Sequence, residues 1–94
     1  MSAPEEAIQL ARGRAETIVG LAAEMLLTGT DLSHVQAHYV IPAIELLSEA
    51  EAVGVLAAGG DRDAGEALDR IAHKLSELRD EALLEIGASE GGEL

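Results

Sequence analysis

Apolar residues recur at intervals of three and four along almost the whole chain, and glycine-containing segments interrupt this spacing at TGTD (28–31) and AGGD (58–61). Such spacing places apolar side chains on one face of a helix, whereas a strand would show an alternation that no segment sustains. Because glycine signals separate consecutive helices and Asp31 offers an N-cap for the second one, the pattern predicts an all-α fold. The expected helices span residues 4–28, 31–58 and 63–86. We therefore predict a single domain (1–94) built as a three-helix up-down-up bundle, with residues 87–94 as a flexible tail.

Capping signals support two of these helix starts. Ser2 with Glu5, and Asp63 with Glu66, match the capping box, in which a cap side chain and an acid three residues later satisfy each other's backbone N–H groups. Gly87 follows the last apolar residue of the third segment, where a C-cap glycine is typical. We therefore expect the first helix to begin just after Ser2 and the third helix to end just before Gly87.

The second predicted helix has the broadest apolar surface. One stripe of three-four spacing contains Leu32, Val35, Tyr39, Ala43, Leu46, Ala50, Val53 and Ala57. Val40, Ile44 and Leu47 lie beside that stripe. This arc is wider than a helix with one buried face needs, so we expect the second helix to be contacted on more than one side. It would be the central element of a monomer or the interface of a dimer.

Pro42 lies inside this stripe, and the stripe keeps its phase on both sides of it. Proline has no N–H to donate, and its ring displaces the carbonyl four residues earlier, which is that of His38. The unchanged phase favours one continuous helix with a kink at Pro42 over two separate helices. The kink either bends the helix around the core or leaves a notch beside His38 for a partner or an ion.

The core predicted from these stripes is thin. Alanine is frequent, and the chain has one tyrosine but no phenylalanine or tryptophan, so each residue buries little apolar area. In a chain of 94 residues this favours a homodimer, which would double the buried area, although small domains also fold alone as monomers. The expected self-association contacts are Leu32, Val35, Tyr39 and Leu46.

The second helix also contains two histidines one turn apart. His34 and His38 share a face with Asp31, three residues before the first, and Glu45, seven residues after the second. Imidazole and carboxylate groups in this arrangement suit zinc, nickel or copper. The set lacks the glutamate that zinc proteases place directly after the first histidine and the Glu-x-x-His spacing of di-iron bundles. A metal-binding bundle using these four residues is therefore one hypothesis; the alternative is a solvated polar face and no cofactor.

The formal net charge of −12 excludes several partners. Between Ala15 and Asp61 the sequence has no lysine or arginine, so we expect no basic face for a phosphate backbone or an anionic membrane. The first residues carry acids where a signal peptide needs basic groups, and Glu24 interrupts the longest apolar segment before it reaches the ~18 residues of a membrane span. The sequence has no cysteine, and small secreted domains often need disulfides. We therefore predict a cytoplasmic protein that binds neither nucleic acid nor membranes directly.

Carboxylates concentrate in the second half of the third helix. This acidic set contains Glu77, Asp80, Glu81 and Glu85. Acids at this end oppose the helix dipole, and like charges four residues apart destabilise a helix slightly. The pattern indicates either an acidic surface for a basic protein partner or simply the composition of an acid-rich proteome.

The sequence contains no recognisable catalytic motif. Tyr39 has no evident basic partner for acid–base chemistry, and His73 forms no triad motif with Ser33 or Ser76. The glycine pairs are not followed by a phosphate-binding pattern. We therefore expect a non-enzymatic helical protein–protein interaction module, an adaptor or regulator. The alternative is a small acidic inhibitor that mimics nucleic acid and blocks a nucleic-acid-binding protein.

Overall fold

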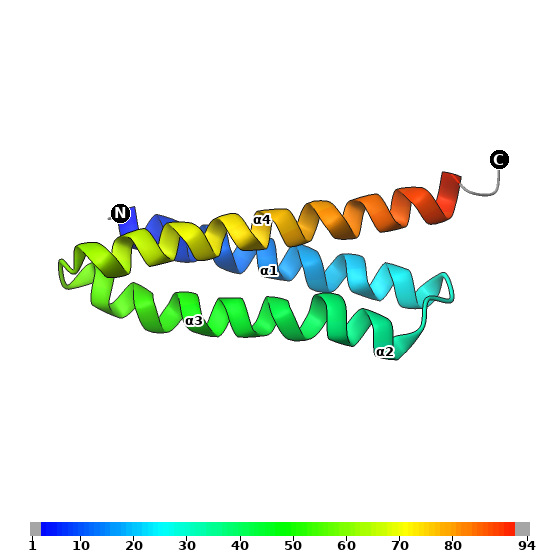
Figure 1. Cartoon of the computed structure of the whole chain (residues 1–94), viewed down its shortest axis with the longest axis horizontal. Helices are drawn as coiled ribbons and strands as arrows, with labels where there is room; N and C mark the ends of the chain where they lie inside the picture. Colours follow the sequence, from blue (N-terminus) through cyan, green and yellow to red (C-terminus); the bar gives the residue numbers. More distant parts are fainter. Residues whose placement is uncertain (1–2, 92–94) are drawn as a thin grey trace.

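The computed structural model describes residues 3–91, with side chains described through residue 88. In chain order it contains α1 (Ala3–Leu27), α2 (Leu32–Val35), the π-helix η1 (Gln36–Val40), α3 (Ile41–Ala58) and α4 (Arg62–Gly91). Because α2, η1 and α3 follow one another without interruption, the chain forms three rods that run up, down and up in a body of 51 × 22 × 18 Å (Figure 1). The predicted all-α three-helix bundle is confirmed. Within the described residues, no helix is both long and apolar enough to cross a membrane.

Two Schellman-type turns reverse the chain between the rods. At the end of α1 the Thr30 N–H donates to the Met25 carbonyl (2.9 Å), and the Gly29 N–H donates to the Leu26 carbonyl (3.2 Å). The turn after α3 repeats this pattern with Gly60 in the position of Gly29. These two glycines have φ angles of 96° and 99°, a left-handed conformation that glycine adopts without a Cβ clash.

The helices that follow these turns begin at aspartates. Asp31 Oδ2 accepts a hydrogen bond from the His34 N–H at 3.2 Å, so the capping role predicted for Asp31 is confirmed. The cap of α4 is Asp61, whose Oδ1 accepts from the Ala64 N–H at 3.1 Å. The capping role predicted for Asp63 is therefore wrong, because α4 has already begun one residue earlier. Each turn thus ends in the aspartate that starts the next helix.

The helix α4 extends beyond its predicted end. It runs to Gly91, so Gly87 is not its C-cap and residues 87–91 continue the helix. A glycine inside a helix costs only about 1 kcal/mol relative to alanine, which the helix-forming neighbours of Gly87 offset. The other helix boundaries differ from the predicted ones by at most one residue. The predicted cap Ser2 and residues 92–94 of the predicted tail lie outside the described residues.

The core is built largely from alanine. Nine of the sixteen buried apolar residues in the described chain are alanines. The largest fully buried side chains are Ile18, Met25, Val35, Leu68 and Leu75. Alanine lets helices approach closely but buries little apolar area. One such close approach joins α1 to α3 at buried Gly54, where an added Cβ would overlap with the Ile8 side chain.

The second rod changes its helix type just before Pro42. In η1 the Ile41 N–H donates to the carbonyl of Gln36, five residues earlier, as in a π-helix. A π turn inserts one residue into the helical winding. We attribute this insertion to Pro42, which has no N–H with which to continue the α-helical ladder. The kink predicted at this proline stays a prediction, whereas the change of helix type is observed.

Two glycine substitutions test this packing. A Cβ added at Gly20 meets nothing within 4 Å, so Gly20→Ala should raise the free energy of unfolding by about 0.5–1 kcal/mol through helix propensity. Gly54→Leu should lower it by about 1–3 kcal/mol, because the new side chain must displace Ile8. Urea unfolding followed by circular dichroism measures both changes. Equal effects at the two positions would contradict the close approach of α1 and α3 at Gly54.

Candidate functional site

The structure leaves only part of the predicted self-association surface exposed. Val35 and Tyr39 are 0% and 5% exposed within a single chain, and Leu46 is half-buried against the same core. Leu32 is 53% exposed. The prediction that Val35 and Tyr39 form a seam between two copies is therefore wrong, because helices of the same chain already cover both side chains.

The four residues of the predicted metal site do not come together. The side chain of Asp31 caps α2, while Glu45 lies on α3 beyond the π turn. Since a π turn takes more residues than an α-helical turn, the spacing of seven no longer aligns Glu45 with His38. No group of three or more His, Cys, Asp or Glu in the described part of the chain is placed to hold a metal ion. The predicted set, which also includes His34, is therefore not a metal site within one chain.

Instead, His34 and Tyr39 converge on a carboxylate of α4. His34 Nε2 and the Tyr39 hydroxyl each donate a hydrogen bond to the same oxygen, Glu85 Oε1, at 2.9 Å. The His38 ring lies beside His34, with ring centroids 4.4 Å apart. We call this cluster of His34, His38, Tyr39 and Glu85 the Glu85 clamp. It ties α2 and η1 to the C-terminal half of α4.

The clamp shifts the titration of two of its members. The hydrogen bond from His34 is the main cause that lowers the pKa of the Glu85 carboxyl, against the opposing effect of partial burial. Burial and, next, the hydrogen bond to Glu85 raise the pKa of Tyr39 to about 12. Near neutral pH the tyrosine is therefore a protonated donor and the glutamate an ionised acceptor. The hydrogen bond between Tyr39 and Glu85 therefore stabilises the fold, and the pair is poorly suited to proton transfer near neutral pH.

The predicted acidic surface of α4 is partly paired within the chain. Glu77 Oε1 lies 2.9 Å from His73 Nε2, and Asp80 Oδ1 lies 3.3 Å from an Arg79 nitrogen. Glu85 turns toward α2 and η1 and does not face outward as predicted. The exposed carboxylates of the predicted set are Glu77, Asp80 and Glu81. The fully outward acidic surface is thus narrower than the sequence suggested.

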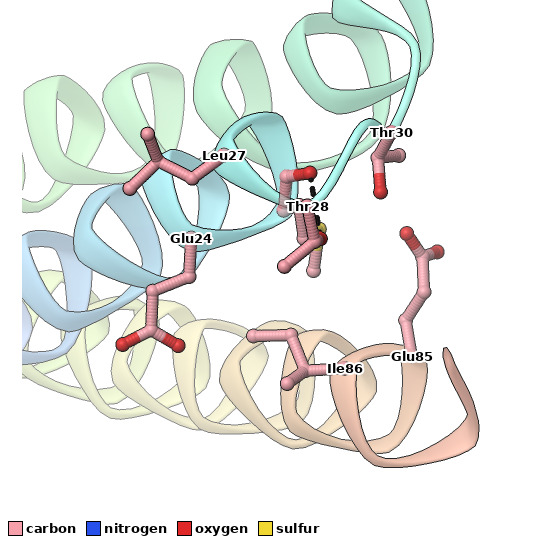
Figure 2. A pocket seen from close by; sticks show the side chains of 7 residues that line it. Glu24, Leu27, Thr28, Thr30, Glu85 and Ile86 are labelled. Atoms are coloured by element: carbon pink, nitrogen blue, oxygen red, sulfur yellow. Dashed lines mark hydrogen bonds between the residues drawn. The ribbon is translucent and has the colours of Figure 1, made fainter. Parts of the chain in front are cut away.

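A hollow of about 340 Å³ lies beside the clamp, between the end of α1 and α4 (Figure 2). Its lining consists of Glu24, Met25, Leu27, Thr28, Thr30, Glu85 and Ile86. Figure 2 shows the carboxylates of Glu24 and Glu85 on opposite sides of the hollow. The Thr28 hydroxyl is already used, since it donates to the Met25 carbonyl at 3.0 Å. With no lysine, arginine or histidine in its lining, the hollow suits a small cationic group better than an anion.

A second concave surface is almost entirely apolar. A groove of about 250 Å³ runs between α1 and α3 and is lined by Ala15, Glu16, Val19, Ala43, Ile44 and Leu47. We call it the α1–α3 groove. Its rims are Val19 and Ile44, which are 44% and 54% exposed, while Ala15 and Ala43 form a buried floor. The groove therefore presents large apolar side chains to solvent around a floor of small ones.

Sequence reasoning found one wall of this groove and missed the other. The width of the apolar arc around Ile44 and Leu47 already indicated a second contact surface on this helix. Val19 gave no such signal, because Glu16 and Gly20, which lie beside it on α1, are not apolar. Helical geometry extends the apolar surface to Leu26, seven residues after Val19 on the same face of α1 and also exposed.

Comparison with protein-family models, with curated protein sequences and with solved structures found no match to this chain. No family therefore supplies an activity, a ligand or a set of site residues. The function has to follow from the groove, the charge distribution and the Glu85 clamp.

The alkaline titration of Tyr39 tests the clamp. The chain has a single tyrosine, so the ultraviolet absorbance of tyrosinate reports this residue alone. We expect a midpoint near 12, above the ordinary value of 10.0. Because the neutral phenol is favoured in the fold, its stabilisation is complete below pH 10.0 and is lost as the pH rises toward 12. The free energy of unfolding, measured with denaturant at stepped pH, should therefore fall in that same range, and a midpoint at 10.0 in the folded protein would contradict the burial of Tyr39.

The matched variants for this titration are Glu85→Gln and Glu81→Gln. Glu85 raises the pKa of Tyr39 through a hydrogen bond and its charge, whereas Glu81 acts through its charge alone. Glu85→Gln should therefore move the midpoint toward 10.0 by more than Glu81→Gln does. Neither should restore 10.0 fully, because burial is the largest cause of the shift.

The stability of the protein in acid tests the same carboxylate. The pKa of Glu85 is lowered from its ordinary 4.5, so its contribution to stability is present just above pH 4.5 and is lost as the pH falls through the folded-state value. The difference in free energy of unfolding between the native protein and Glu85→Gln should therefore narrow as the solution is acidified below pH 4.5. Denaturant unfolding at stepped pH measures this, and Glu81→Gln is the control. A difference that does not change with pH would be inconsistent with the His34–Glu85 bond.

Proposed function

We propose that this chain is a non-enzymatic acidic protein-interaction module, an intracellular adaptor or regulator that binds its partner through the α1–α3 groove. The observation that carries the proposal is the exposure of Val19 and Ile44 around a concave apolar surface. Contiguous apolar surface of this kind commonly marks a binding site in a small domain. The groove is also the place where a third neighbour for α1 and α3 would fit.

The charge distribution supports a basic partner. The chain carries a formal net charge of −12 and has no lysine or arginine between Ala15 and Asp61. Both walls of the groove come from this stretch. An acidic surface attracts a basic partner over distance and disfavours acidic competitors. Apolar contacts in the groove would then provide affinity. The carboxylates around it would increase the association rate and the selectivity for a basic partner.

The non-enzymatic and intracellular parts of the proposal have separate support. Tyr39, held as a donor to Glu85 with a pKa of about 12, is a poor general acid near neutral pH. The absence of cysteine from the sequence fits a cytoplasmic protein, since small secreted domains often rely on disulfides. We therefore propose a cytoplasmic binding module that needs no cofactor.

The other functions predicted from the sequence have weaker support. A nucleic-acid mimic needs an array of outward carboxylates, yet Glu85 turns inward to His34, which leaves Glu77, Asp80 and Glu81 as the exposed carboxylates of the predicted set. A metal site assembled from two copies would need the two histidine pairs to meet, and His34 is already bonded to Glu85. A homodimer remains a proposal, but with Val35 and Tyr39 buried it would have to use other apolar side chains that are exposed.

Affinity capture with paired variants tests the proposed function. The native protein, Ile44→Gln and Leu84→Gln would each be tagged and incubated with an extract of the native cell. Ile44 and Leu84 are both exposed, on α3 and α4, and glutamine is neutral and helix-forming. We expect a protein retained by the native chain and by Leu84→Gln but reduced about tenfold with Ile44→Gln, as for loss of one central apolar contact.

Two further measurements in that experiment distinguish the groove-binding module from the nucleic-acid mimic. Circular dichroism of the two variants checks that both retain the fold. A captured protein that binds nucleic acid, and that DNA or RNA displaces with a steep salt dependence, would favour the mimic. Equal capture by Ile44→Gln and the native chain would remove the groove from the proposal.

A further inference from the structure

The α1–α3 groove has the geometry of an unfilled position in a helical bundle. The rods α1 and α3 lie side by side with α4 packed on the pair (Figure 1). On bundles of this type an additional helix lies in the groove between two neighbours, with its side-chain ridge between theirs. Here the ridge would enter between Val19 and Ile44, above the floor formed by Ala15 and Ala43.

The size and chemistry of the groove fit the ridge of an amphipathic helix. Its volume of about 250 Å³ exceeds the roughly 150 Å³ of an apolar cavity that holds benzene, so a leucine-sized side chain can enter. The same apolar character continues lengthwise through Leu26 on α1 and Ile41 on α3, which are both exposed. A helix presents apolar residues at such intervals along one face, whereas a small ligand would leave the outer part of this surface uncovered.

The charges around the groove indicate which residue types would flank the apolar ridge of that helix. Glu16 is the one charged residue in the lining of the groove, and it is exposed on α1. Near one end, Arg12 and Glu51 form an ion pair across α1 and α3 with a distance of 3.1 Å. Beyond that pair, the stretch that forms both walls offers carboxylates and no cation. Long basic side chains beside the apolar ridge would therefore find carboxylates within reach.

The same charges argue against a second copy of this chain as the occupant. A symmetric pairing through the groove would bring the Glu16 carboxylates of the two copies toward each other. Each copy also carries a net charge of −12, so the two would repel at moderate salt. Like charges that face each other across an interface disfavour it, whereas opposite charges favour association.

We propose that the α1–α3 groove binds one amphipathic helix of a partner protein, whose apolar ridge is bordered by lysine or arginine. This inference rests on the proposed interaction function and names the chemistry of its partner. The ridge packs between Val19 and Ile44, and a basic residue on its border pairs with Glu16. The partner helix folds against the groove as the fourth rod of the bundle.

Three synthetic peptides test the proposal. The first has leucine at helical spacing with lysine on both borders, the second has the same leucines with glutamate borders, and the third keeps the lysines but replaces the leucines with serine. Binding to the full chain is followed by fluorescence anisotropy and by the gain of helical circular dichroism. We expect saturable one-to-one binding of the first peptide alone. The lysine–serine peptide measures general attraction to an acidic protein.

Variants of the chain locate the binding of the first peptide. Ile44→Gln should weaken it at least about tenfold, as for loss of a central contact. Glu16→Gln should weaken it about two- to fivefold, with a smaller dependence on salt, as for one exposed ion pair. Leu84→Gln, at a position 74% exposed on α4, should leave it unchanged. Equal binding of the lysine and glutamate peptides, or no effect of Ile44→Gln, would overturn the proposal.

Sedimentation separates this inference from self-association and from failure of the proposed function. A concentration-dependent dimer that Ile44→Gln abolishes would overturn the basic helix in favour of a second copy. If cellular capture depends on Ile44 but the lysine–leucine peptide does not bind, the basic helix is wrong while the interaction function stands. If neither capture nor peptide binding depends on Ile44, both fail.

Discussion

The close approach of three helices over an alanine-rich core is the constraint on which the rest of the structure depends. At Gly54 an added Cβ would overlap with the Ile8 side chain, and most buried apolar residues in the described chain are alanines. A core this narrow is filled by the faces of α1 and α3 that point directly into it. Val19 and Ile44 lie beside those faces and stay exposed at the edge of the core, where they form the rims of the α1–α3 groove. The close packing of the three helices thus leaves the candidate binding surface exposed to solvent.

The π turn determines the second organising feature, the Glu85 clamp. By adding a residue to the winding before Pro42, it sets the phase of the segment that carries His34 and Tyr39 relative to α3. Both side chains then reach Glu85, and this contact holds α4 in the region where the sequence suggested that it ends. Glu85 was predicted to belong to an outward acidic surface, but it links α4 to α2 and η1 instead. The acidic surface that a partner could contact is therefore smaller.

Groove and charge together describe one kind of binding partner. An apolar groove alone would accept a second copy of the chain, and an acidic surface alone would attract any cation. Because the walls of the groove come from a stretch without lysine or arginine, the two properties coincide in space. Apolar contacts between Val19 and Ile44 would provide residence time, while the carboxylates would guide encounter and reject acidic helices.

The sequence by itself determined the helical rods, their turns and their approximate order. The periodicity, glycine signals and Asp31 cap are local properties, because helix winding and capping involve residues only a few positions apart. Only the tertiary structure decided that Val35 and Tyr39 face the inside of one chain, that Glu85 binds His34, and that Asp31 and Glu45 separate. These outcomes depend on which rods lie against which faces and on one inserted π residue. A stripe of apolar residues specifies that a face is buried, but the neighbour that covers it is set by packing between segments far apart in the chain.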